Sequence, residues 1–167
     1  MSETALKEKR GEHPFGDAGQ LILFVIFIAV WVADSFFLRR STFLAKYAPL
    51  PVRVALLALA LFGAVSLVRS AGEVVHHGQR PDHVLSGGAF RYVRHPLYLG
   101  VLLFYVGLVL VTASLYSLAV FAAIFIFYNY ISGYEEKLLE ARYGEAYKDY
   151  KARTGKWVPR IRGTRQA

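Results

Sequence analysis

The chain has 167 residues, of which 55% are hydrophobic and 19% are charged. This composition excludes intrinsic disorder and fibrous repeats, and the absence of cysteine excludes disulfide scaffolds, thiolate metal sites and cysteine nucleophiles. The net charge of +8 suits either nucleic acid or an anionic membrane surface, so the position of the charges has to decide between them.

The N-terminal part of the chain divides into a polar segment and an apolar one. Residues 1–19 are mixed in charge and interrupted by glycine and proline, which predicts a flexible cytoplasmic arm. Residues 21–38 carry one charge, Asp34, and as a helix would extend about 27 Å, close to the thickness of a bilayer core. Asp34 is either a functional residue, or a carboxylate near the outer helix end that snorkels to the interface or pairs with Arg39.

The next apolar segments predict three further crossings. Residues 48–68 form the first, with prolines suited to its first turn and Arg69 as its end. Residues 97–134 contain 38 residues without a formal charge, about twice the roughly 20 that one crossing needs. We therefore expect a hairpin of two helices, 97–111 and 115–131, with its turn at Thr112, Ala113 and Ser114.

After the hairpin, apolar residues spaced three and four apart predict a cytoplasmic amphipathic helix over about residues 135–152. The expected fold is therefore an all-α integral membrane protein with about four transmembrane helices, the last two a hairpin, and this C-terminal helix.

The distribution of basic residues predicts the orientation. With four crossings, sixteen of the lysines and arginines lie on the side of both termini and four on the other side. The positive-inside rule then makes both termini cytoplasmic. Because topology accounts for the basic charge, we expect no nucleic-acid partner. The histidines at positions 76–95 match no common metal-ligand spacing, so we expect no metal site.

Two groups of opposite charge flank the hairpin. They are Arg91, Arg94 and His95 before Pro96, and Glu135 and Glu136 after the last helix. Because a hairpin returns its second helix to the side where the first began, the two groups should face each other at the membrane surface. Exposed ion pairs of little energetic weight and a site for a zwitterionic ligand are both compatible with this pattern.

The sequence RYVRHPLYLG at residues 91–100, followed by the apolar hairpin and by EEKLLEARYGEAYKDYKARTGKWVP at residues 135–159, resembles a known superfamily. This superfamily is that of the integral membrane methyltransferases, and it includes isoprenylcysteine carboxyl methyltransferases and phospholipid N-methyltransferases. The resemblance is strongest over residues 83–159 and implies a single methyltransferase domain over residues 20–167. It also implies S-adenosylmethionine, held at the cytoplasmic end of the hairpin, and a lipophilic or lipid-like acceptor from the bilayer.

The resemblance further implies which residues bind the cofactor. They are His83, Val84, Leu85 and Phe90 before the hairpin, Arg94, His95, Pro96, Tyr98 and Gly100 at its start, and Glu135 and Glu136 at its end. The candidates for a catalytic role are Arg94, His95 and Glu136.

The isoprenylcysteine branch has an arginine for the substrate carboxylate where this chain has Asn129 and Tyr130, which makes these two the candidate substrate-binding residues. The acceptor stays open among a prenylcysteine-type carboxylate, a lipid amine and a small thiol. The absence of that arginine makes the carboxylate less favoured than the other two.

Two other functions remain open from the sequence. A sterol-type, NADPH-dependent membrane reductase has a similar C-terminal region. However, this chain is short for that class, and it carries a glutamate pair at the place where methyltransferases have one. A non-catalytic small membrane protein belongs to a different class altogether. Cofactor binding discriminates among the three, and the sequence leaves the oligomeric state open.

Overall fold

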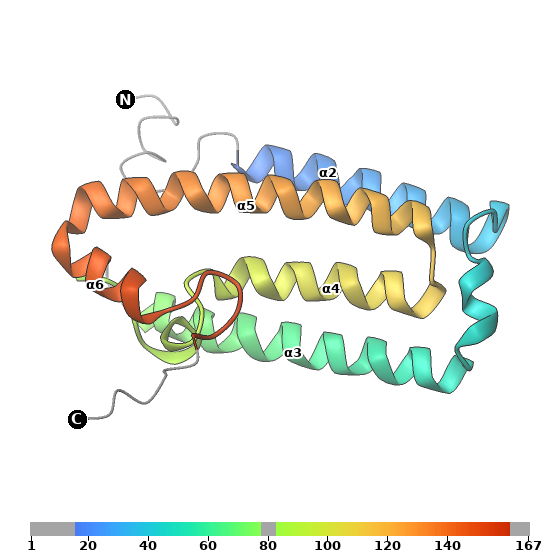
Figure 1. The fold of residues 1–167 in the computed structure, drawn as a ribbon, viewed down its shortest axis with the longest axis horizontal. Helices are drawn as coiled ribbons and strands as arrows, with labels where there is room; N and C mark the ends of the chain where they lie inside the picture. Colours follow the sequence, from blue (N-terminus) through green and yellow to red (C-terminus); the bar gives the residue numbers. More distant parts are fainter. Residues whose placement is uncertain (1–15, 78–82, 161–167) are drawn as a thin grey trace.

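The computed structural model describes residues 16–77 and 83–160. Five α-helices account for most of them: α2 (Gly16–Val32), α3 (Leu50–His77), α4 (Pro96–Thr112), α5 (Leu115–Tyr143) and α6 (Glu145–Arg153). The four long helices run side by side, α2 against α5 and α3 against α4, and short α6 folds back at one end (Figure 1). The expected all-α architecture is confirmed for this part of the chain.

Three segments are long and apolar enough to cross a membrane: Gly16–Leu38, Leu50–Val75 and Leu115–Tyr143. The protein is therefore a multi-pass membrane protein. The fourth apolar helix, α4, has 17 residues and extends about 26 Å, somewhat less than a bilayer core.

The first apolar helix starts earlier than expected and changes its winding before it ends. Because α2 begins at Gly16, residues 16–19 are helical, and the remainder of the predicted arm, residues 1–15, lies outside the described residues. After Val32 the chain continues as a π-helical turn, Ala33–Leu38. Arg39 ends this turn with φ +50°, and its N–H donates to the carbonyl oxygen of Asp34 at 2.8 Å.

Asp34 lies buried at the end of the bundle opposite α6, with 1% of its surface exposed. Its carboxylate accepts hydrogen bonds from the backbone N–H of Arg40 at 3.0 Å and of Ser41 at 3.1 Å. The hydroxyls of Ser41 and Ser114 donate to it as well, the second at 2.6 Å. Among the described residues, the hydrogen-bond partners of this carboxylate are thus backbone amides and serine hydroxyls, and they tie the hairpin turn to the loop after α2.

The second apolar helix is longer than the sequence suggested. We expected it to end at Arg69, but α3 continues without interruption to His77. The apolar run defines where a helix leaves the bilayer, whereas arginine and glutamate are good helix formers that extend it into water. The expected end at Arg69 was therefore wrong by two turns.

The predicted hairpin is confirmed, including its turn. Helix α4 starts at Pro96 and ends at Thr112, and Ala113 takes a left-handed conformation with φ +53°. Ser114 then caps α5, because its side chain accepts a hydrogen bond from the N–H of Ser117 at 3.1 Å.

The end of the hairpin differs from the prediction. We expected one helix to stop near residue 131 and another to cover 135–152, but α5 runs unbroken to Tyr143. The break comes at Gly144, whose φ of +56° suits glycine, and α6 follows it. No proline lies between residues 131 and 135, so the helix continues through Ser132 and Gly133. With 29 residues against 17, α5 extends about 18 Å further than α4, which brings its glutamates level with the residues that precede α4.

Helices α3 and α4 make the closest contact in the bundle because glycines face the neighbouring helix. A Cβ atom at Gly107 would lie 2.9 Å from Leu57 Cδ1, and one at Gly100 would lie 2.8 Å from Val68 Cγ2. On the other side of α4, a buried cluster joins it to α2 and α5: Phe27, Leu102, Tyr105, Val109, Ile124, Tyr128 and Ile131. This packing fixes the start of α4 against the last part of α5.

Candidate functional site

Arg94 and His95 meet Glu136 where the start of α4 faces α5. The Nε atom of Arg94 donates to Glu136 Oε1 at 2.8 Å, and His95 Nε2 lies 3.1 Å from the same oxygen. All three side chains are at least 90% buried. The expected meeting of the two charged groups is confirmed for these residues, whereas Arg91 is exposed and stays outside the cluster.

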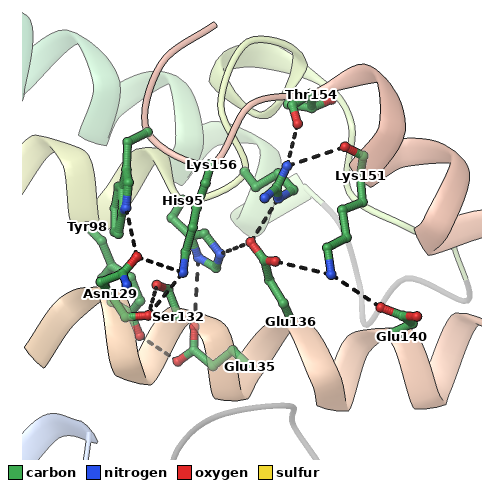
Figure 2. Close-up of polar contacts among 12 residues, drawn as sticks. His95, Tyr98, Asn129, Ser132, Glu135, Glu136, Glu140, Lys151, Thr154 and Lys156 are labelled. Carbon is green, nitrogen blue, oxygen red and sulfur yellow. Dashed lines mark hydrogen bonds and ion pairs between the residues drawn. The ribbon is translucent and has the colours of Figure 1, made fainter. Parts of the chain in front are cut away.

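His95 is a neutral base in this setting. Burial lowers the pKa of its imidazole, an effect that Glu136 opposes and that the cations Lys156 and Arg94 reinforce. Since a carboxylate accepts hydrogen bonds, the contact with Glu136 assigns the ring proton to Nε2 and leaves the lone pair on Nδ1. Nδ1 lies 3.9 Å from Glu135 Oε2, beyond hydrogen-bond distance (Figure 2).

Glu135 is held by an aromatic side chain of α4. The hydroxyl of Tyr98 donates to Glu135 Oε1 at 2.6 Å. The Tyr98 ring stacks on the His95 ring with centroids 5.7 Å apart and meets Tyr128 edge-on at 5.2 Å. Tyr98 therefore orients both the carboxylate and the imidazole on which any proton transfer here would depend.

Arg94 also joins the site to the segment after α6. Its Nη1 atom donates to the carbonyl oxygens of Lys151, at 3.4 Å, and of Thr154. Its backbone N–H donates to the carbonyl of Gly155 at 2.9 Å, next to a parallel bridge between Val93 and Gly155. Arg94 is thus as much a structural clamp on the C-terminal segment as a charged group of the site.

Two of the four predicted residues that precede the hairpin line an open pocket of about 550 Å³. They are His83 and Val84, and they face residues of the last turn of α5 and of α6, among them Arg142 and Tyr150. Burial raises the pKa of Tyr150 to about 12, so its hydroxyl stays protonated, and it donates to the carbonyl of Phe90 at 2.7 Å.

Two of the predicted positions, Pro96 and Gly100, are explained by the fold itself. Pro96 is the buried first residue of α4, and Gly100 lets α4 approach α3, since a Cβ there would also lie 3.1 Å from the Ala64 carbonyl oxygen. Leu85 is half-buried and does not line the pocket.

The sequence profile of the phospholipid methyltransferase family matches residues 52–146. The chain belongs to this family. Its members are S-adenosylmethionine-dependent methyltransferases, so this protein is a membrane methyltransferase that uses S-adenosylmethionine. The matched region runs from the start of α3 to the start of α6 and contains the cluster of Arg94, His95, Glu135 and Glu136. Comparison with curated proteins and with solved structures gave no match.

Residues beyond this region also contact the cluster, and they were not among the predicted site residues. Lys151 Nζ lies 3.6 Å from Glu136 Oε2 and 3.4 Å from Glu140 Oε2 (Figure 2). Trp157 lies with its ring centroid 5.8 Å from that of His95. The only signal in the sequence was the density of basic and aromatic residues after position 142.

Of the two substrate candidates of the methyltransferase, one is engaged by the C-terminal segment. Asn129 Oδ1 accepts hydrogen bonds from Lys156 Nζ at 3.0 Å and from Trp157 Nε1 at 3.2 Å. Tyr130 is 64% exposed on the outer face of α5. Trp157 therefore contacts both Asn129 and His95, whereas Tyr130 lies on the side of the lipid.

Proposed function

We propose that the methyltransferase transfers its methyl group to the amine of a lipid at the cytoplasmic membrane surface. The observation that carries this proposal is the state of His95: a buried, neutral imidazole whose Nδ1 faces Glu135 across 3.9 Å. A carboxylate attracts an ammonium group, and a neutral imidazole can take its proton. A carboxylate acceptor would be ionised already and would be repelled by the glutamate pair.

The cofactor-binding residues follow from the chemistry of the groups present. S-adenosylmethionine offers ammonium and ribose hydroxyl donors, for which Glu135 and Glu136 are acceptors, and a carboxylate suited to an arginine such as Arg94. An adenosyl group suits the pocket lined by His83 and Val84, whose volume lies in the range of small-molecule sites. When bound, the cofactor supplies the methyl group as an electrophilic carbon on a sulfonium.

The chain's own contribution is to position the acceptor and remove its proton. An amine is nucleophilic only when neutral. A nitrogen placed between Glu135 Oε2 and His95 Nδ1 can donate to both, because their separation exceeds a single hydrogen bond. The proton then passes to Nδ1, and the resulting imidazolium is stabilised by Glu136 on its other nitrogen, at 3.1 Å.

The topology that we propose has four crossings, with α4 as a short one, and both termini in the cytoplasm. The excess of lysine and arginine on the side of the site supports this orientation. The buried cluster of Arg94, His95 and Glu136 then lies at the level of the lipid head groups, where an acceptor amine is found.

The first experiment measures cofactor binding and the acceptor together. Calorimetry on the detergent-purified protein should give binding of S-adenosylmethionine and S-adenosylhomocysteine and none of NADPH. Labelled donor should then pass to lipid amines, and alkali should not release the label as methanol, because an N–CH3 bond survives alkali. Label that alkali releases as methanol would identify a carboxyl ester and overturn the amine proposal.

A variant of the base tests the mechanism. His95→Gln keeps a donor for Glu136 but cannot take a proton, so kcat should fall by about 10²-fold to 10⁴-fold while cofactor affinity stays within a few-fold. Raising the pH should restore part of the rate, because the amine then ionises by itself. An unchanged kcat would contradict the role of His95.

A further inference from the structure

Lys156 reaches from the segment after α6 to the face of α5 beside the site. Its Nζ atom donates to the backbone carbonyl oxygen and to the side-chain oxygen of Asn129, both at 3.0 Å (Figure 2). An ammonium group has three N–H donors, and Asn129 accepts two of them. Gly133, one turn along α5, carries no side chain to fill the space beside Nζ, since a Cβ there would lie 3.7 Å away.

The Lys156 ammonium donates its hydrogen bonds to neutral groups. Both acceptors at hydrogen-bond distance are carbonyl oxygens, so no anion within the described residues pairs directly with this ammonium. Burial lowers the pKa of Lys156, with Glu136 raising it and Arg94 lowering it. An anionic ligand would bind such a half-buried cation favourably, because a hydrogen bond between two charged groups is stronger than one to a neutral oxygen.

The surroundings of Lys156 are apolar on the side of the bilayer. Phe125, Ile126 and Tyr130 on the same stretch of α5 are 40%, 69% and 64% exposed. Trp157, the next residue, lies between the rings of Phe125 and His95, with centroids 5.9 Å and 5.8 Å away. A ligand that comes from the lipid therefore meets the Lys156 ammonium next to the base of the site.

We infer that Lys156, held by Asn129, binds the phosphate of the acceptor lipid and so directs the amine of a zwitterionic head group toward His95. This assignment rests on the proposed function. It makes Lys156 the residue that distinguishes a phosphodiester with a terminal amine from a lone amine, which would gain nothing from a cation at this place. Lys156 lies outside the region that the family profile matches.

The test compares two acceptors of equal chain length, a short-chain phosphatidylethanolamine and an alkylamine, with labelled donor. Lys156→Gln should raise KM for the phospholipid about tenfold and leave KM for the alkylamine unchanged, while Lys156→Arg should retain the wild-type values. The matched control is Lys148→Gln, which removes the same charge from an exposed side chain paired with Glu145. Equal changes of KM for both acceptors, or no change, would overturn the assignment.

A binding measurement without cofactor separates this assignment from turnover. The chain has two tryptophans, so in a Trp31→Phe background the emission reports on Trp157 alone. Short-chain phosphatidylethanolamine should change this emission, and Lys156→Gln should shift the titration to about tenfold higher concentration. Inorganic phosphate at equal concentration should have little effect. If it acts as strongly as the lipid, the site binds free anions and the head-group assignment is wrong.

The failure of this assignment can be told from the failure of the proposed function. If the wild type methylates both amines and Lys156→Gln behaves like the wild type, only the assignment of Lys156 is wrong. If the wild type methylates neither amine, both the proposed function and the assignment of Lys156 are wrong. Cofactor binding and the thermal midpoint of each variant show that it is folded.

Discussion

The two ends of the helix bundle each bury a carboxylate, but they surround it differently. Asp34 receives donors from two backbone amides and two serine hydroxyls, groups that belong to the turns joining the helices. Glu136 receives long charged side chains, Arg94 and Lys151, from segments on either side of the hairpin. Short, fixed donors hold a carboxylate in one place, whereas long side chains can exchange partners with a ligand. Burial of an acid in a membrane helix therefore does not by itself identify a site.

The largest effect should follow from removing the fixed carboxylate. Asp34→Ala leaves the Ser41 and Ser114 hydroxyls and two backbone amides without their acceptor, so the free energy of unfolding should fall by about 3 kcal/mol or more. Thermal unfolding in detergent measures this loss. Ser35→Ala is the matched control, because the Ser35 hydroxyl has no hydrogen-bond partner in the described residues and its removal should change little. Equal stability of the two variants would mean that the cluster at Asp34 is not structural.

A smaller loss of stability should follow at a glycine that the family resemblance attributes to cofactor binding. Gly100→Ala forces a Cβ to 2.8 Å from Val68 Cγ2 and should destabilise the protein by about 1 to 3 kcal/mol. Gly72→Ala on α3 is the control, since that position has open space and should gain slightly from alanine. If Gly100→Ala instead lowers cofactor affinity with an unchanged thermal midpoint, the residue belongs to the site and not to the helix contact.

At the end of the bundle that holds Glu135 and Glu136, removal of a charge should affect cofactor binding more than folding. Glu135→Gln keeps an oxygen that accepts from Tyr98, so the thermal midpoint should change little, while affinity for S-adenosylmethionine should fall about tenfold. Calorimetry measures the affinity, with exposed Glu145→Gln as the control. Unchanged affinity would remove Glu135 from the cofactor site.

The smallest effect concerns the pH dependence of stability. The pKa of His95 is lowered by burial, so between its folded value and about 6.5 the unfolded chain binds more protons than the folded one. Stability should therefore fall as the pH drops below about 6.5 and recover as the pH rises. The thermal midpoint of His95→Gln should lack this part of the decline. Parallel curves for wild type and variant between pH 5 and 8 would contradict a neutral His95.

Local signals in the sequence predicted the hairpin well. A long uncharged run, a proline at its start and three small or polar residues at its middle define two antiparallel helices without any knowledge of packing. The contact of Arg94 and His95 with Glu136 followed from that geometry alone.

The lengths of the helices and the contacts of the C-terminal segment could not be predicted in the same way. Hydropathy marks where α3 and α5 leave the lipid, but both continue into water until His77 and Gly144. The contacts of Lys151, Lys156 and Trp157 depend on how the chain reverses at Gly144 and again at Gly155. At the latter, a Cβ would lie 1.7 Å from the Val158 carbonyl oxygen, so the turn tolerates only glycine.

The clamp between Arg94 and residues 151–155 has a consequence for biosynthesis. Translation proceeds from the N-terminus, so all membrane helices are made before the carbonyl groups that Arg94 binds at Lys151, Thr154 and Gly155. A chain still emerging from the ribosome can thus insert its hairpin into the bilayer while the polar end remains incomplete. The candidate site closes only afterwards, so membrane insertion precedes the completion of the polar end of the bundle.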